Sequence, residues 1–208
     1  MTYGFDPSTH TYTIDGVAVP SVTEICSVLT AGKYSGGQGV IDAARARGTA
    51  VHELCEAYDY GTLEEVPAEL AGYVKAWADF CRDYRPEWLF VEHMMFSKEL
   101  QMAGTCDRIG VIDGKRVVVD IKTTANMDRA SKLALACQLF AYEVLYYRQH
   151  REKIDGDSFG VQLKRDGTYT VHTMMNIANK YSAHIGSLLA SCREIYFAVN
   201  GRKEWKNE

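Results

Sequence analysis

The sequence lacks any long hydrophobic run, which argues against a membrane protein. None of its apolar stretches approaches the ~18 residues that a membrane-spanning helix requires, and its first residues do not have the pattern of a signal peptide. We therefore expect no membrane association and a cytoplasmic location.

Closely spaced cysteines are also lacking. The six cysteines form no C-x-x-C pair and are scattered along the chain, at Cys26, Cys55, Cys81, Cys106, Cys137 and Cys192. Several fall on apolar faces of the expected elements, where a reduced thiol behaves as a small hydrophobic side chain. We predict reduced core thiols, and neither a disulfide framework nor a zinc site.

The sequence also has no excess of positive charge. Lysine and arginine total 23 against 27 for aspartate and glutamate, so the net charge is −4. No overall positive field can hold nucleic acid without specificity, although a local basic groove with bound metal ions remains compatible with these numbers. The length of 208 residues suits one domain. We expect it to comprise an N-terminal hairpin (1–20), a core (21–175) and a C-terminal helix and tail (176–208).

The stretch around which the rest is organised is a predicted β-hairpin centred on Asp113-Gly114. This dipeptide is typical of a two-residue turn with positive φ at both positions. If these two residues form the loop, Asp107 on one strand lies directly opposite Asp120 on the other. Cross-strand partners have Cβ atoms about 4.5–5.5 Å apart. Lys122, two residues beyond Asp120, projects from the same face.

Two opposed carboxylates in apolar surroundings repel each other, and a divalent cation supplies the compensation. Asp107, Asp120 and the Ile121 carbonyl offer the oxygen ligands that Mg²⁺ prefers. Lys122 would then stabilise charge on a phosphate or orient an attacking water. The alternative is a surface hairpin with a polar face, but the apolar run 117–119 favours a strand buried on both faces.

The helix expected at 40–60 adds a histidine to these candidates. His52 and Glu56 share one face, and Gly48 lies one turn earlier, where a small residue would permit close approach to another backbone. His52 is a borderline metal ligand that could reach the carboxylates of the hairpin. A surface histidine paired with Glu56 explains the same pattern equally well.

Polar residues on two further elements are candidates. Glu92, inside a strand expected at 88–96, would be a third acid, unless it faces water at a sheet edge. Gln138 and Tyr142 are spaced i,i+4 on a helix expected at 128–150 and could bind a phosphate or a DNA base. The alternative is an ordinary amphipathic helix with two polar residues at its border.

The remaining patterns predict a mixed central β-sheet flanked by helices, an α/β or α+β fold. Further strands are expected at 3–19 (a hairpin), 159–164 and 169–174, and further helices at 21–29 (opened by a capping box), 67–84 and 176–199 (capped by Asn176). The segment 31–39 is a candidate mobile loop in which Lys33 and Tyr34 could touch a substrate, and a plain surface loop is equally consistent.

Four motifs in this order resemble those of the PD-(D/E)XK nuclease superfamily, in particular its RecB-like exonuclease branch. They fall within about 21–142 and read Arg47-Gly48-x-x-x-His52-Glu53, Gly104-x-x-Asp107, Asp120-Ile121-Lys122-Thr123 and Gln138-x-x-x-Tyr142. The resemblance implies a restriction-endonuclease-like core.

The resemblance also implies roles for these residues. One or two Mg²⁺ or Mn²⁺ ions would be bound by His52, Asp107, Asp120 and the Ile121 carbonyl. Asp107, Asp120 and Lys122 would be catalytic. We expect supporting or DNA-contacting roles for a further set, namely Arg47, Glu53, Glu92, Thr123, Gln138 and Tyr142.

Two departures from the family pattern matter. Cys106 replaces the proline that names the motif, while the ligand Asp107 is retained. Some relatives hold an iron–sulfur cluster on four cysteines that include a close C-terminal group, but only Cys192 lies near this C-terminus, so we expect no cluster. The segments 5–14 and 19–23 resemble compact RecB-like proteins of bacteriophages, so the expected location is the cytoplasm of a bacterial or infected host cell.

The resulting expectation is a metal-dependent DNA exonuclease that acts in DNA replication, recombination or repair. Its substrate would be single-stranded DNA or DNA with a free end, because few basic residues suit a narrow channel. A recombinase or single-strand-annealing protein is a candidate partner, and no pattern specifies an oligomer interface. The alternatives are a structure-specific DNA endonuclease, a nuclease-fold protein that only binds DNA or a recombination partner, and a metallohydrolase of another class, which would show more histidine ligands.

Overall fold

The structure is a computed structural model that describes residues 1–32 and 37–202. The candidate loop residues Lys33 and Tyr34 and the end of the tail, 203–208, lie outside the described residues. The strands are β1 (Tyr3–Asp6), β2 (Thr11–Ile14), β3 (Val17–Val19), β4 (Glu87–Ser97), β5 (Met102–Ile112), β6 (Lys115–Lys122), β7 (Phe159–Leu163) and β8 (Tyr169–Thr173). The helices are α1 (Val22–Cys26), the 3₁₀ turn η1 (Ser27–Leu29), α2 (Gln38–Asp59), α3 (Ala71–Tyr84), α4 (Arg129–His150), α5 (Met174–Tyr181) and α6 (Ile185–Asn200).

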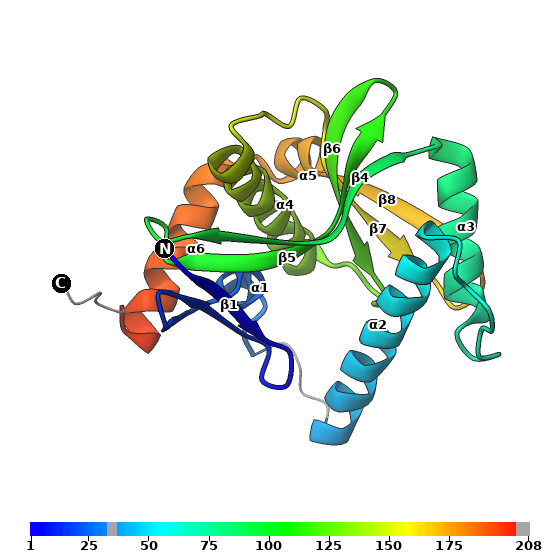
Figure 1. The fold of residues 1–208 in the computed structure, drawn as a ribbon, viewed down its shortest axis with the longest axis horizontal. Coiled ribbons are helices and arrows are strands. Elements are labelled where there is room, and N and C mark those ends of the chain that lie inside the picture. The colour runs from blue at the N-terminus through cyan, green and yellow to red at the C-terminus, as the bar shows by residue number, and fades with distance from the viewer. Residues whose placement is uncertain (33–36, 203–208) are drawn as a thin grey trace.

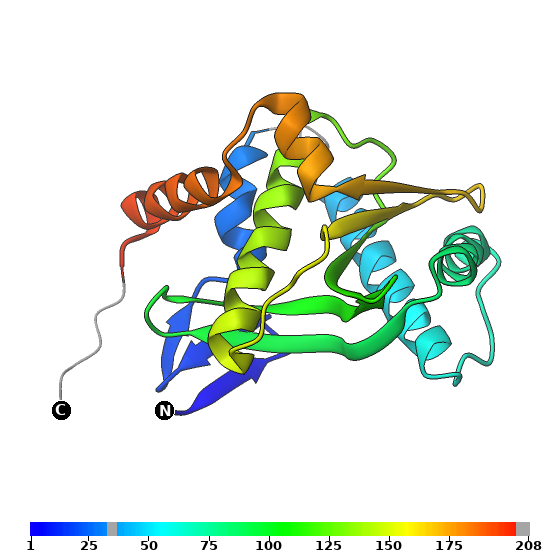
Figure 2. The ribbon, with the colours of Figure 1, turned by 90° about the horizontal axis from the view of Figure 1, so that it is seen from above.

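The central sheet has five strands in the order β4-β5-β6-β7-β8. β6 and β7 are parallel and are joined through α4, while the other neighbours are antiparallel. Helices cover both faces (Figures 1 and 2): α1, α4 and α6 pack on one, and α2 and α3 on the other. The predicted mixed sheet flanked by helices is confirmed.

The strand β6 is buried on both faces, as its apolar run predicts. Val118 joins the hydrophobic core under α4, whereas Val117 and Val119 join the core under α2 and α3. Because side chains alternate along a strand, Asp120 projects to the α4 side. This alternation excludes the surface hairpin that the sequence left open.

The turn that organises the hairpin forms as predicted. Asp113 and Gly114 have φ of 50° and 74°. The strand register also follows the prediction, from Ile112 opposite Lys115 back to Arg108 opposite Val119.

The ladder ends one step before the two aspartates, so the predicted direct pairing of Asp107 with Asp120 is wrong. The carboxylate of Asp107 instead accepts a hydrogen bond of 2.6 Å from the Ile121 N–H. On its other edge β6 pairs with β7, where Asp120 lies opposite Gly160. β5 and β6 separate at the carboxylates, which opens a site between them.

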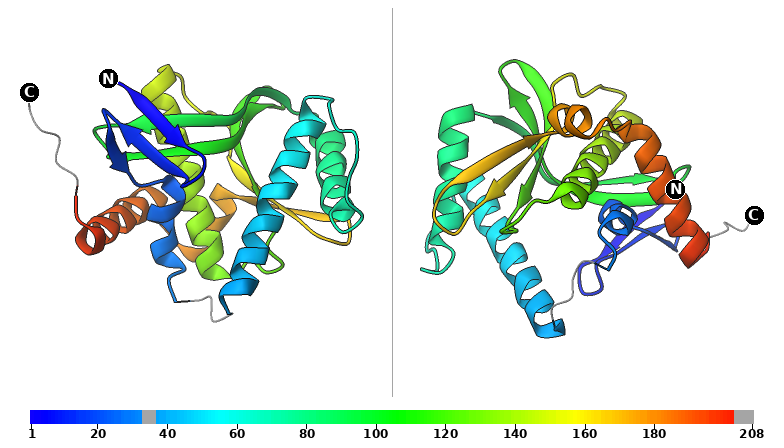
Figure 3. Two further views of the ribbon diagram at one scale, coloured as in Figure 1. Left: turned by 60° about the horizontal axis from the view of Figure 1, so that its bottom comes forward. Right: turned by 180° about the vertical axis from the view of Figure 1, so that it is seen from behind.

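The N-terminal segment differs from the expected hairpin. It forms a three-stranded sheet, β1-β2-β3, because the chain folds back twice, at 7–10 and again at Asp15-Gly16. The small sheet lies against β4 and β5 (Figure 3). Ala103 N–H donates to the Pro20 carbonyl at 3.0 Å, and this bond holds the sheet on β5.

The helix boundaries confirm one cap and correct another. Ser21 and Glu24 form the predicted capping box of α1. The C-terminal helix expected at 176–199 is two helices, because Ser182 adopts a φ of 49° between them. Asn176 is not the cap: its N–H donates to the Thr173 hydroxyl, which caps α5.

Among the described residues, no helix is both long and apolar enough to cross a bilayer.

Candidate active site

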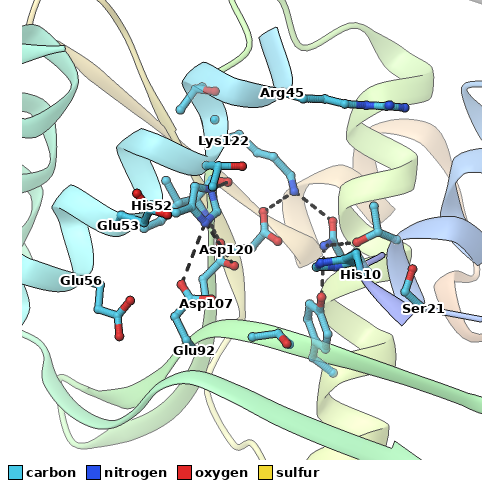
Figure 4. A pocket seen from close by; sticks show the side chains of 18 of the residues that line it. His10, Ser21, Arg45, His52, Glu53, Glu56, Glu92, Asp107, Asp120 and Lys122 are labelled. Atoms are coloured by element: carbon cyan, nitrogen blue, oxygen red, sulfur yellow. Dashed lines mark hydrogen bonds and ion pairs between the residues drawn. The ribbon is translucent and has the colours of Figure 1, made fainter. Parts of the chain in front are cut away.

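The pocket at the separated strands has a volume of about 570 Å³ and is lined by α1, α2, the strands β4 to β6, α4 and the small N-terminal sheet (Figure 4). Most of the residues predicted from the sequence line it: His52, Glu53, Glu92, Asp107, Asp120, Ile121, Lys122, Thr123, Gln138 and Tyr142. They come from elements far apart in the sequence, so the fold brings them together.

One side of the pocket contains a potential metal-binding group. The Nδ1 atom of His52 lies 3.6 Å from the Asp107 carboxylate and 4.0 Å from that of Glu92. One ligand atom from each of the three residues lies within 4.8 Å of the others. Two carboxylate oxygens and an imidazole nitrogen are a donor set that suits Mg²⁺ or Mn²⁺.

The orientation of the His52 ring fits this group to a cation. Its Nε2 lies 3.2 Å from the Ile121 carbonyl, which can only accept a hydrogen bond, so Nε2 carries the proton. In the neutral ring, Nδ1 then offers its lone pair toward two carboxylates. This nitrogen and the Asp107 carboxylate face each other as two acceptors, which a bound cation would stabilise, while the Glu92 oxygen nearest to His52 also accepts a hydrogen bond from Arg108 at 3.1 Å.

Lys122 and Asp120 lie beside this group and form the floor of the pocket. The ammonium lies 2.7 Å from the Asp120 carboxylate and donates to the Gln138 side-chain oxygen at 3.0 Å. Burial raises the pKa of Asp120 to about 6, against the opposing effect of Lys122. For Lys122, burial works against the charged form, but Asp120 and Asp107 outweigh it and raise its pKa. The lysine is therefore a cation at neutral pH.

Gln138 and Tyr142 fix this lysine from α4. The Gln138 amide donates to the Tyr142 hydroxyl and to the Thr23 hydroxyl, each at 3.3 Å. Tyr142 is buried under β5, where a Cβ at Gly104 would come within 3.0 Å of its ring. The glycine of the Gly104-x-x-Asp107 motif thus makes room for the helix that positions Lys122.

Glu92 has an unusual backbone and a perturbed carboxyl group. Its φ is 50°, and it is missing from the β4–β5 ladder between Val91 and His93. Burial and the nearby Asp107 charge raise the pKa of Glu92 to about 8. The local turn of the backbone aims this side chain into the pocket instead of leaving it at an open edge.

Sequence reasoning missed a buried ion pair behind the pocket. Arg108 bonds Asp59 at 2.6 Å and Glu92 at 3.1 Å, and it donates to the backbone carbonyl of Asp107 at 2.6 Å. Its guanidinium also lies over the Trp77 ring. A charged arginine in the middle of an apolar strand was the available signal, since such a residue needs a buried partner.

The residues of the expected Arg47-Gly48 pair are placed differently from the prediction. Arg47 lies in a separate depression between α2, α3 and the turn after β7, away from the pocket. A Cβ at Gly48 would meet only the Thr123 hydroxyl, at an ordinary 3.6 Å, so the expected close backbone approach is absent. Arg45 lines the pocket instead.

Several pocket residues were not predicted from the sequence to belong to the site. They are His10, Tyr12, Ser21, Thr23, Arg45, Thr49, Thr105 and Thr124. Most are short hydroxyl residues, and the first two belong to the N-terminal sheet, whose position on β5 depends on long-range packing.

Comparison with known proteins agrees with this geometry. Residues 40–203 match the family model described as the PD-(D/E)XK nuclease superfamily. A search of the curated proteins found no match. The matched segment holds the metal-binding group, the lysine and the α4 residues, on a restriction-endonuclease-like fold. PD-(D/E)XK nucleases use divalent metals, and the matched segment covers most of the sequence, so this chain belongs to the PD-(D/E)XK nuclease superfamily.

Proposed function

We propose that this protein is a metal-dependent DNA exonuclease that hydrolyses phosphodiester bonds at the pocket between β5 and β6. One observation carries the proposal. The Lys122 ammonium, held between Asp120 and Gln138, shares a pocket with the group formed by His52, Glu92 and Asp107. Cation-binding oxygens beside a fixed ammonium are suited to stabilising a phosphate under attack.

The proposed metal ligands for one or two Mg²⁺ or Mn²⁺ ions are His52, Asp107, Asp120 and the Ile121 carbonyl, with Glu92 nearby. When bound, the metal neutralises phosphate charge and makes water more acidic. Hydrolysis joins the water oxygen to phosphorus and breaks one ester bond to a sugar oxygen, which leaves with a proton. Lys122, as a cation, donates hydrogen bonds to the phosphate oxygens on which charge builds up.

The other pocket residues have proposed supporting roles. Gln138 and Tyr142 hold Lys122 in place through the contacts described above. Glu53 and Thr123 line the pocket and are proposed to contact substrate or bound water. Arg47 lies outside the pocket, so its proposed role is to contact DNA beyond the reacting phosphate.

A single strand is the proposed substrate. The pocket, at about 570 Å³, is in the size range of sites for small ligands. A strand end can enter a pocket of this size, which supports the proposed exonuclease action.

The proposal extends to the biological setting. The resemblance of 5–14 and 19–23 to phage proteins supports a phage-encoded enzyme of one domain, acting in the cytoplasm of a bacterial or infected host cell. DNA replication, recombination or repair would supply the strand ends. A recombinase or single-strand-annealing protein would be a fitting partner.

Labelled DNA tests the mode of action. Single- and double-stranded linear DNA, labelled at the 5′ or the 3′ end, and a closed circle are incubated with Mg²⁺, Mn²⁺ or EDTA. We expect metal-dependent loss of linear DNA only, with the labelled products giving the polarity. Cutting of the circle would identify an endonuclease instead. DNA binding without cleavage under either metal would identify a protein that only binds.

A further inference from the structure

We propose that His10 of the N-terminal sheet stacks on a base of the DNA strand and thereby positions that strand in the pocket. This inference rests on the proposed function. The residue lies outside the segment 40–203 that matches the superfamily, so the contact would be supplied by a part of the chain outside that match.

The first observation is the place of His10. It lines the pocket together with Asp107, Asp120 and Lys122, and its side chain stays exposed (Figure 4). It is the last residue of the loop 7–10, which joins β1 to β2. An exposed ring at the edge of a nuclease pocket is available to a base.

The second observation is that the ring of His10 is held in position. It packs nearly perpendicular to the rings of Phe5 and Tyr12, with centroids 5.1 Å and 5.6 Å away. The Tyr12 hydroxyl is 2.8 Å from that of Thr105 on β5. Thr105 precedes Asp107 by two residues and so projects from the same side of the strand. The ring is thereby fixed relative to the proposed catalytic carboxylate.

The third observation is the backbone of the loop. His10 has a φ of 52°, in the left-handed region that histidine, asparagine and aspartate adopt more often than other non-glycine residues. The loop is stabilised by Asp6, whose carboxylate accepts bonds from the N–H and the hydroxyl of Ser8 at 2.9 Å and 2.7 Å.

The fourth observation is the distribution of charge. Glu53, Glu56 and Glu92 line the pocket from α2 and β4, together with Arg45 of α2, and the carboxylates of Glu53 and Glu56 repel a polyanion. His10, Tyr12, Ser21 and Thr23 line the pocket from the N-terminal segment and α1, which, among the residues that the structure describes, add no carboxylate to the lining. Glu24, the nearest acid to these residues in sequence, is bonded to Ser21 in the capping box and does not line the pocket.

These observations assign the two parts of a nucleotide to different groups. The phosphate belongs on the floor, beside Lys122. The neighbouring base then lies against the side of the pocket lined by His10 and Tyr12, where the ring of His10 can stack on it. Stacking on histidine and other aromatic side chains is the usual way in which proteins hold unpaired bases.

The test measures DNA binding rather than cleavage. The full chain carrying Asp120→Asn is used as a parent that should bind without cutting, with Ca²⁺ and a fluorescent single-stranded oligonucleotide. His10→Asn tolerates the positive φ but removes the ring, and His10→Phe keeps a ring without the imidazole nitrogens. His184→Asn is the control, since His184 is an exposed histidine at the start of α6, outside the pocket.

We expect His10→Asn to weaken binding roughly 5- to 150-fold, the range for loss of one stacked base. His10→Phe and His184→Asn should bind like the parent. Moving one abasic site along the oligonucleotide should identify a position at which His10→Asn has no further effect. Thermal melting should stay the same in all variants.

The outcomes separate this inference from the proposed function. Equal binding by His10→Asn and the parent would overturn the inference alone. Weakening by His10→Phe as large as that by His10→Asn would overturn the stacking role. A parent that binds no DNA, in a protein that cleaves none, would overturn the proposed function together with the inference.

Discussion

The guanidinium of Arg108 lies 2.6 Å from the Asp59 carboxylate, and the two side chains are 0% and 2% exposed. Asp59 is the last residue of α2, the helix that supplies His52, and Arg108 follows the pocket residue Asp107. The ion pair therefore joins α2 and β5, two of the three elements that supply the potential metal-binding group. Removing one partner leaves the other charge buried.

A double-mutant cycle on this pair has a defined expected outcome. Arg108→Met and Asp59→Asn should each lower the free energy of unfolding by about 3–5 kcal/mol, because an uncompensated charge or dipole stays buried. The double variant should lose less than the sum of the two. Urea unfolding followed by circular dichroism measures all four proteins. Additive losses would contradict a direct coupling between these side chains.

Lys122→Ala should abolish most activity while the fold persists. The ammonium is the donor closest to Asp120 on the pocket floor, and loss of one such electrostatic contact lowers kcat by about 10²–10³-fold. The assay is the release of labelled nucleotides under saturating DNA, with melting temperature as the check on folding. Glu64→Gln, a change at an exposed carboxylate outside the pocket, is the control and should keep full activity. A variant at Lys122 with normal kcat would remove this residue from the mechanism.

Gly104→Ala tests the packing that holds α4 against β5. The added methyl group would lie 3.0 Å from the Tyr142 ring and 3.2 Å from a Val22 methyl, so the neighbours must move. We expect a loss of stability of about 1–3 kcal/mol and lower activity, because Tyr142 supports Gln138. Gly39→Ala, which meets nothing within 4 Å, is the matched control and should not lose stability. A stable and fully active Gly104→Ala variant would show that the close contact is unimportant.

Glu143 lies outside the active-site pocket, and its partly buried carboxyl group should make the stability of the protein depend on pH. Burial raises the pKa of its carboxyl to about 7, although the Ser158 hydroxyl donates to it at 2.6 Å. The folded state then holds a proton that the unfolded state releases above its ordinary pKa of about 4.3. The contribution of Glu143 to stability is therefore largest below that pH, falls as the pH rises to about 7, and is constant above it.

Glu143→Gln provides the comparison for this prediction. It keeps a polar group of the same shape without the titration, so its unfolding free energy should fall less than that of the wild type between pH 4.5 and 7. We expect the difference to change by about 1–2 kcal/mol across this window, after allowance for partial exposure. Urea unfolding at a series of pH values measures it. Parallel curves for the two proteins would contradict a raised pKa.

Local patterns predicted much of the fold, and long-range packing explains where they were insufficient. Asp113-Gly114 determines the turn by its own backbone preferences, so the register could be predicted from the sequence. The end of the ladder before Asp107, where its carboxylate accepts from the Ile121 N–H instead, follows from no turn or strand preference in the hairpin.

The same distinction applies to the pocket. Glu92 was recognised as an acid in an apolar strand, but the positive φ that aims it inward is a tertiary effect. The Asp59–Arg108 pair joins residues 49 positions apart in the chain, and no spacing rule connects them. His10 reaches the pocket only because the N-terminal sheet packs on β5.

The central claim is that the group formed by His52, Glu92 and Asp107, with Asp120 and Lys122, is a metal-dependent nuclease site. The most direct measurement is the rate at which end-labelled single-stranded DNA is degraded by wild type, Asp107→Asn and Glu64→Gln, each with Mg²⁺ and with EDTA. We predict rapid degradation by wild type and Glu64→Gln with Mg²⁺, none with EDTA, and none by folded Asp107→Asn under either condition. Equal degradation by Asp107→Asn and the wild type, or degradation that persists in EDTA, would contradict the account.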